Sequence, residues 1–103
     1  MSSHRRPLSL DTVVKTRSNQ VSSRVEDELV ILDLDRSLYY ALDPVGARVF
    51  ELLREPRAIA DVVGVVVAEF DVDVETARAD LLALVEDLVS ERLVEAAGSD
   101  ARP

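Results

Sequence analysis

The chain has 103 residues, 48% of them apolar and 31% charged, a composition typical of one soluble globular domain. Its 20 acidic residues outnumber 12 basic ones, and the net charge of −8 argues against nucleic acid or anionic membranes as partners. Without cysteine, it has no disulfide, thiolate metal site or cysteine nucleophile. No apolar run approaches the roughly 18 residues of a membrane span, and no signal peptide is recognisable, so we expect a cytoplasmic protein.

The first third of the chain predicts three strands. Residues 1–9 are polar and lack periodicity, so we expect a flexible arm there. A short strand follows at Thr12–Thr16, and residues 17–23 (RSNQVSS) have the composition of a loop. The next strand runs from about Val25 to Leu34. Because it has apolar residues on both faces, it should be covered on both sides or at least lie in the middle of a sheet.

A polar turn, Asp35–Ser37, joins this strand to the next one at Leu38–Leu42. With so short a connection the two strands must pair as an antiparallel hairpin. Alternation puts three residues of the last strand on one face and two on the other: Leu38, Tyr40 and Leu42, then Tyr39 and Ala41.

Two helices are predicted directly after the hairpin. Asp43 can accept a backbone N–H as N-cap, and Pro44 fits the first helical position, where no N–H is needed. This first helix ends at Glu55-Pro56, and the second covers about Ala58 to Phe70. Gly46 and Gly64 fall inside these helices, where close helix packing would explain them.

The third predicted helix is the longest, from Val74 to about Leu93, with Asp73 as its N-cap. Its apolar stripe is wider than packing on one neighbour requires, and residues 96–103 after it predict a flexible tail. The stripe consists of Leu81, Leu84, Val85 and Leu88, widened by Leu82 and Val89. The order of elements predicts an α+β domain, winged helix-turn-helix-like, in which a three-stranded antiparallel sheet is followed by three helices.

No group of residues predicts an enzyme, a cofactor site or a metal site. The only histidine, His4, lies in the predicted arm, where no partners can converge on it. There is no glycine-rich phosphate loop, and carboxylate pairs such as Glu86-Asp87 fall on predicted solvated surface.

Three kinds of function stay open on residue pattern alone. A winged helix could bind DNA, but five acids against two arginines over Val74–Arg92 would repel the phosphate backbone. The chain could be a structural subunit that docks on an enzyme without touching its substrate. Alternatively, an extended peptide could add to the edge of strand Ser37–Leu42 beside the third helix; against this, the wide stripe could be entirely core.

The pattern of the chain resembles the PqqD-like family over about residues 10–95. The resemblance implies a domain of three strands and three helices that recognises the leader segment of a ribosomally synthesised precursor peptide. The leader would bind as an extra strand on the third strand, in a cleft closed by the third helix. The residues that carry the resemblance are Leu29–Leu34, Leu38–Asp43, Ala47–Leu53, Ile59–Val63, and the closing Leu81, Leu84, Leu88 and Arg92–Val94.

Transferred by position, the resemblance implies a leader-binding site on the strand and on the facing side of the third helix. These residues are Ser37, Leu38, Tyr39, Tyr40, Ala41, Leu42, Ala77, Asp80, Leu81, Leu84, Val85 and Leu88. Which of Tyr39 and Tyr40 faces the cleft stays open.

The resemblance also implies which partners to expect. Small, acidic, free-standing members are similar to the lasso-peptide recognition proteins, which present the leader to a separate leader peptidase (a transglutaminase-like cysteine protease) that acts before a lasso cyclase. The chain lacks the glycine- and proline-containing segment that precedes the first helix in pyrroloquinoline quinone members, which favours lasso biosynthesis.

Overall fold

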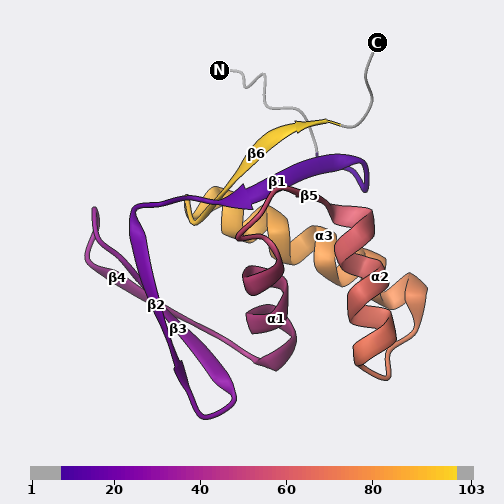
Figure 1. Cartoon of the computed structure of the whole chain (residues 1–103), viewed down its shortest axis with the longest axis horizontal. Helices are drawn as coiled ribbons and strands as arrows, with labels where there is room; N and C mark the ends of the chain where they lie inside the picture. Colours follow the sequence, from indigo (N-terminus) through magenta and orange to yellow (C-terminus); the bar gives the residue numbers. More distant parts are fainter. Residues whose placement is uncertain (1–7, 100–103) are drawn as a thin grey trace.

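Figure 1 shows the computed structural model, which describes residues 8–99. Its antiparallel strands and three helices confirm the mixed class predicted from the sequence. His4 and the rest of residues 1–7, and residues 100–103 of the predicted tail, lie outside the described residues. The elements are β1 (Thr12–Thr16), β2 (Gln20–Val25), β3 (Glu28–Asp33), β4 (Leu38–Leu42), α1 (Pro44–Leu52), β5 (Arg57–Ala58), α2 (Ile59–Glu69), α3 (Val74–Ser90) and β6 (Val94–Ser99).

The strands form two sheets of three strands each, in the orders β5-β1-β6 and β2-β3-β4. The prediction of one sheet that combines Thr12–Thr16 with the hairpin was therefore wrong. The chain leaves β1 at residues 17–19 and enters the second sheet as β2, whose residues 20–23 were predicted to be loop. Figure 1 shows the second sheet beside the helices and the first one above them.

β2 forms because its backbone can pair with β3 along its whole length. The two strands pair from Gln20 opposite Asp33 to Val25 opposite Glu28. An edge strand needs few apolar side chains, since its inner backbone groups are satisfied by its neighbour, so the polar composition of β2 gave no strand signal. β3 is consequently the central strand, as predicted, but it is covered on one face only.

β6 was also missed by the sequence analysis, which assigned residues 96–103 to a tail. Residues 96–99 belong to β6, which pairs antiparallel with β1 through a bulge between Val13 and Val14. Leu8, in the predicted arm, packs against the core as well. The distance along the chain between β1 and β6 explains why no local pattern indicated their pairing.

The helix starts agree with their predicted caps. The Asp43 carboxylate accepts the Gly46 N–H at 2.8 Å, with Pro44 at the first helical position of α1. Asp73 accepts the N–H groups of Glu75 and Thr76 at 3.0 and 3.2 Å at the start of α3. α3 ends at Ser90, three residues before its predicted end, because the chain turns there to enter β6.

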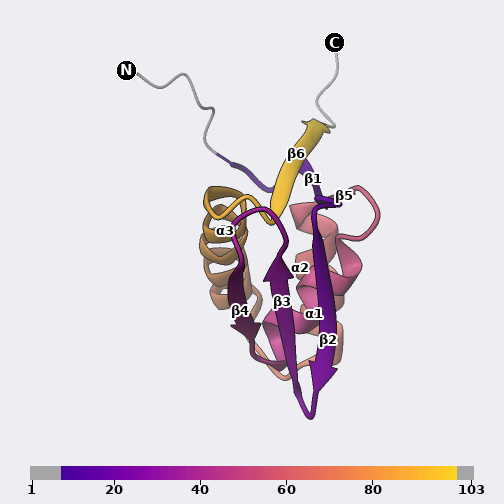
Figure 2. The same ribbon diagram turned by 90° about the vertical axis from the view of Figure 1, so that its left-hand side faces the viewer.

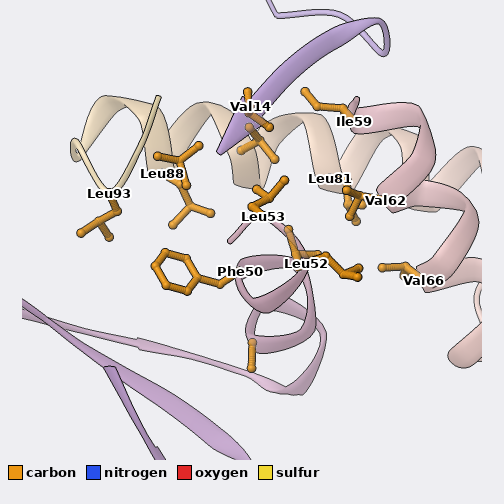
Figure 3. Packing of buried hydrophobic residues seen from close by; sticks show 14 of the residues in the cluster. Val14, Phe50, Leu52, Leu53, Ile59, Val62, Val66, Leu81, Leu88 and Leu93 are labelled. Carbon is orange, nitrogen blue, oxygen red and sulfur yellow. The ribbon is translucent and has the colours of Figure 1, made fainter. Parts of the chain in front are cut away.

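One core joins the three helices to the inner faces of both sheets (Figure 3). Figure 3 shows Phe50 of α1, Leu88 of α3 and Leu93 pointing toward one another, and all three are buried. A Cβ atom at Gly46 would lie 3.3 Å from Leu42, so close packing explains that glycine, although the neighbour is the end of β4 and not another helix. At Gly64 a Cβ atom would meet open space, so the same explanation was wrong there. No helix within residues 8–99 is long and apolar enough to cross a membrane.

Candidate functional site

β4 is the edge strand of its sheet, and α3 runs beside it. The strand pairs with β3 from Leu38 opposite Asp33 to Leu42 opposite Leu29, and its other side has no strand partner within residues 8–99. Figure 2 shows β4 on the side of this sheet where α3 lies, and Tyr40 of β4 contacts Glu91 at the end of α3. The backbone of the predicted third strand is therefore available for pairing with an additional strand.

The two tyrosines of β4 point to opposite sides of the sheet, as the alternation predicted. Tyr39 is 71% exposed on the outer side. Tyr40 lies opposite Ile31, which is fully buried, and its ring packs against the core. Tyr40 is therefore the tyrosine on the α3 side, which the sequence had left open.

Tyr40 belongs to a polar network that connects the β3–β4 turn to the end of α3. Its hydroxyl donates to Glu91 Oε1 at 3.0 Å and accepts from Arg36 Nη2 at 2.8 Å. The same Arg36 nitrogen donates to the Glu91 backbone carbonyl at 2.6 Å. Together these bonds hold the first residues of β4 at a fixed distance from the last turn of α3.

The network also includes Asp33, whose buried carboxylate binds Arg36. Its carboxylate is 1% exposed and accepts hydrogen bonds from the backbone N–H groups of Asp35 and Arg36 and from Arg36 Nε, at 2.9, 3.2 and 3.0 Å. Burial raises the pKa of Asp33, but the hydrogen bonds and the positive charge of Arg36 outweigh it and leave the pKa below its usual value. The pKa of Tyr40 is raised by burial and by its hydrogen bond to Glu91.

At its other end, β4 leads to a cavity of about 310 Å³. The residues that line the cavity come from the start of α1, from α2, from the connection between α2 and α3, and from the first eleven residues of α3. They are Asp43, Val45, Gly46, Val66, Val72, Ala77, Asp80, Leu81 and Leu84. Because apolar side chains predominate and Asp43 and Asp80 add two carboxyl groups, the cavity suits an apolar side chain with a nearby hydrogen-bond donor or positive charge.

The structure divides the predicted α3 residues into two groups. Asp80 is exposed and Leu84 half-buried, and both line the cavity, with Ala77 and Leu81 as its buried floor. Val85 and Leu88 are 1% and 4% exposed and do not line it. These two residues lie in the core. Because α3 packs against two neighbours, most of its wide apolar stripe is buried in those contacts.

Sequence reasoning missed five of the cavity residues: Asp43, Val45, Gly46, Val66 and Val72. Asp43 was identified only as a helix cap, and it does cap α1 through the Gly46 N–H. The signal that could have found it was its position, one residue beyond the edge strand and at the start of a helix. Val66 and Val72 come from other elements, and only the packing of α2 against α3 brings them here.

The groups gathered at this site suit the binding of a ligand. Across residues 8–99, no cluster of three or more His, Cys, Asp or Glu side chains could hold a metal ion. What the site offers is the open backbone edge of β4, the half-buried ring of Tyr40 and, beyond the end of β4, an apolar cavity with two carboxyl groups.

Known proteins share this fold. Residues 28–94 match the family model described as Coenzyme PQQ synthesis protein D (PqqD). A solved structure described as "TbiB1 in Complex with the TbiA(beta) Leader Peptide" is 34% identical, with a TM-score of 0.72, covering 79% of this chain and 94% of that one. Another, "Lasso peptide synthetase B1 complexed with the leader peptide", is 23% identical with a TM-score of 0.71, covering 80% and 96%, and supports the fold alone.

No curated protein matches the chain significantly. The family model nevertheless covers more than half of the chain, and the first solved relative is covered almost from end to end. The chain therefore belongs to the PqqD family, which confirms the resemblance found in its hairpin and helices.

Proposed function

We propose that this protein captures the leader segment of a ribosomally synthesised precursor peptide, of the lasso class, and delivers it to a separate leader peptidase. The single observation that supports capture best is the open edge of β4 beside α3, with the apolar cavity at its end. A relative that is 34% identical was solved with a leader peptide, which favours the same kind of ligand for this chain.

In this proposal the leader adds to β4 as a fourth strand. Its backbone would bond to the free side of Ser37–Leu42, and an apolar side chain would enter the cavity against Leu84 and Asp80. Backbone pairing supplies affinity for any extended peptide, whereas the cavity selects the sequence. A dissociation constant near 1 μM corresponds to about −8 kcal/mol, which a short added strand and one filled pocket can supply.

The recognition unit that we propose comprises residues 10–95, extended by β6 to Ser99. We assign it the winged helix-turn-helix type on the order α1–β5–α2–α3–β6. An adaptor of this kind needs no catalytic group or cofactor, and it would act in the cytoplasm, where precursor peptides are made. The lasso cyclase is a further expected partner downstream. DNA binding gains no support, because the exposed polar residues of α3 are mostly acidic.

The test is titration of a fluorescently labelled cognate leader, followed by anisotropy. We expect saturable binding by the wild-type protein and none at tens of micromolar by Leu84→Asp, because a charge would enter the apolar cavity. Glu95→Ala, on β6 and away from the cavity, is the control and should bind as wild type. Circular dichroism must show that Leu84→Asp keeps its fold. Failure of the wild-type protein to bind the cognate leader would refute the proposal.

A further inference from the structure

A second cavity, of about 380 Å³, lies where β1 ends and β2 begins, and we call it the basic cavity. Its walls come from the end of β1, from the connection to β2, from the inward-facing side of β2, and from α1 with the residues that follow it. It shares no lining residue with the cavity at the end of β4. Figure 2 shows β2 and β4 on opposite sides of β3, so the basic cavity is separate from the edge that we propose for the leader.

The basic cavity is cationic although the chain as a whole is strongly acidic. Lys15, Arg17 and Arg54 line it, and no Asp or Glu of residues 8–99 does. Neither Lys15 nor Arg54 forms an ion pair with another residue of that range. Arg17 pairs with Glu95 at 3.3 Å, but both side chains are substantially exposed, so an incoming carboxylate can replace Glu95 at little cost. The cavity therefore suits an anionic ligand.

Hydroxyl groups accompany these cations. Thr16, Ser18 and Ser22 line the cavity, and Arg54 Nη2 donates to Ser22 Oγ at 3.1 Å. The other N–H groups of a guanidinium match the two oxygens of a carboxylate in pairs, and hydroxyl groups can rotate to donate to the same oxygens. The lining thus favours a ligand that carries carboxylates or other oxyanions.

Two buried acceptor atoms favour a peptide over a free anion. Asn19 Oδ1 and Gln20 Oε1 are buried, and neither accepts a hydrogen bond from residues 8–99. Their amide nitrogens donate to Asp35 Oδ2 at 2.7 Å and to Leu93 O at 3.0 Å, which fixes the orientation of both amides. Gln20 lines the basic cavity, and Asn19 is its neighbour in the chain. A buried acceptor needs a donor, and a peptide backbone supplies N–H groups whereas an ionised carboxylate alone supplies none.

We propose that the basic cavity binds an acidic peptide segment, a loop or chain end of a partner protein that is rich in Asp and Glu. Its carboxylates would bond to Lys15, Arg17 and Arg54, and its backbone N–H groups to Gln20 and Asn19. β2 borders the cavity and is the second edge strand of its sheet, so its open backbone can pair with the same segment.

This site goes beyond the proposed function, because capture of the leader on β4 does not involve it. The net charge of −8 still permits an acidic ligand here, since charges farther away than the Debye length of about 8 Å are largely screened at physiological salt. A short acidic segment meets the local cations of the cavity, whereas a long polyanion such as DNA also meets the acidic surface around it.

The test is titration of a short, labelled, glutamate-rich peptide at physiological salt, followed by anisotropy. We expect saturable binding by the wild-type protein, and none of a matched peptide in which glutamine replaces glutamate. Lys15→Gln/Arg54→Gln removes the two cations without an ion-pair partner in residues 8–99 and should weaken binding about tenfold or more. Leader affinity, measured in parallel, should stay as in the wild type, because neither residue lies on β4 or in the cavity at its end.

The matched control is Arg78→Gln/Arg92→Gln, which removes the same charge at exposed positions outside the basic cavity and should bind the acidic peptide as wild type. Arg54→Gln alone repeats the test if circular dichroism shows that the double variant unfolds. Equal weakening by the control would overturn the assignment, because net charge alone would then explain the binding.

Three other results would also overturn the assignment. They are no saturable binding by the wild-type protein up to about 1 mM peptide, displacement of the peptide by an equal concentration of inorganic phosphate, and a wild-type dimer in sedimentation that Lys15→Gln/Arg54→Gln dissociates. Phosphate displacement would assign the cavity to free oxyanions, and the dimer would assign it to a second copy of this chain. Absence of leader binding by the wild-type protein would refute the proposed function instead and leave this site unaffected.

Discussion

The two sheets of this molecule have the same number of strands but differ in the apolar surface that they expose. Sheet β5-β1-β6 packs on the helices through Val14 in its central strand and Val94 in β6, and none of the large apolar side chains exposed within residues 8–99 belongs to it. Sheet β2-β3-β4 buries only its inner face and leaves its outer face and the β4 edge open. The first sheet exposes little apolar surface, whereas the second carries the open edge that we propose for the leader.

The two sheets meet near Leu93, the residue before β6. The Arg17 N–H, at the end of β1, donates to Leu93 O at 3.1 Å, and the Thr16 N–H of β1 donates to Leu53 O, after α1, at 2.8 Å. Gln20, the first residue of β2, donates from its side chain to the same Leu93 carbonyl at 3.0 Å. Because sheet β2-β3-β4 is held by its inner face and by this contact, its exposed surfaces need not contribute much to stability.

The largest expected effect tests this division of stability. Leu93→Ala should lower the free energy of unfolding by about 2–5 kcal/mol, because the side chain is fully buried where the two sheets meet. Tyr39→Ser, on the exposed side of β4, should change it by less than about 0.5 kcal/mol. Urea denaturation followed by circular dichroism measures both. Similar losses for the two variants would contradict the proposed difference between the sheets.

A smaller effect is expected from the network at the start of β4. Asp33→Asn removes the buried negative charge that holds Arg36, so we expect the melting temperature to fall by several degrees and leader affinity to weaken. Glu69→Gln breaks the Arg48–Glu69 pair, whose side chains are partly exposed, and should change the melting temperature much less. Equal effects would show that the network has no special role in holding β4.

The pH dependence of the same network has a definite sign. Because the pKa of Asp33 is lower in the folded protein than its usual 3.8, the unfolded chain binds more protons in this range. The stability from Asp33 is therefore fully present above about pH 4 and is lost as the pH falls through the folded pKa. Thermal melts below pH 4 should show a steep loss in the wild type and a shallower one in Asp33→Asn. An unchanged slope would contradict this assignment.

The smallest expected effect is a gain. Gly64→Ala should stabilise the protein by about 0.5–1 kcal/mol, because α2 loses a flexible residue and the new methyl group meets open space. Leader binding should not change, since Gly64 is outside the cavity. Gly46→Ala is the matched control and should give no gain, because its Cβ would lie 3.3 Å from both Asp43 and Leu42. Urea denaturation measures both variants.

Much of the candidate site followed from local pattern. The hairpin, its alternation and the caps at Asp43 and Asp73 were all predictable, because each depends on residues within a few positions of one another. The tyrosine assignment was not predictable, since alternation says which residues share a face but not which face is covered. The cavity could not be predicted either, because its walls come mainly from three helices whose packing no single segment specifies.

The sequence by itself determined the hairpin, the three helices and, through their order and apolar spacing, the family. Only the tertiary structure decided that β1 leaves the hairpin to pair with β5 and β6, that polar β2 takes its place, and that Val85 and Leu88 lie in the core. The physical reason is the range of the interactions. Caps and tight turns depend on residues that are near neighbours in the sequence. An edge strand, in contrast, depends on the backbone of the strand with which it pairs. Glu91 likewise contacts Arg36 only after the whole chain has folded.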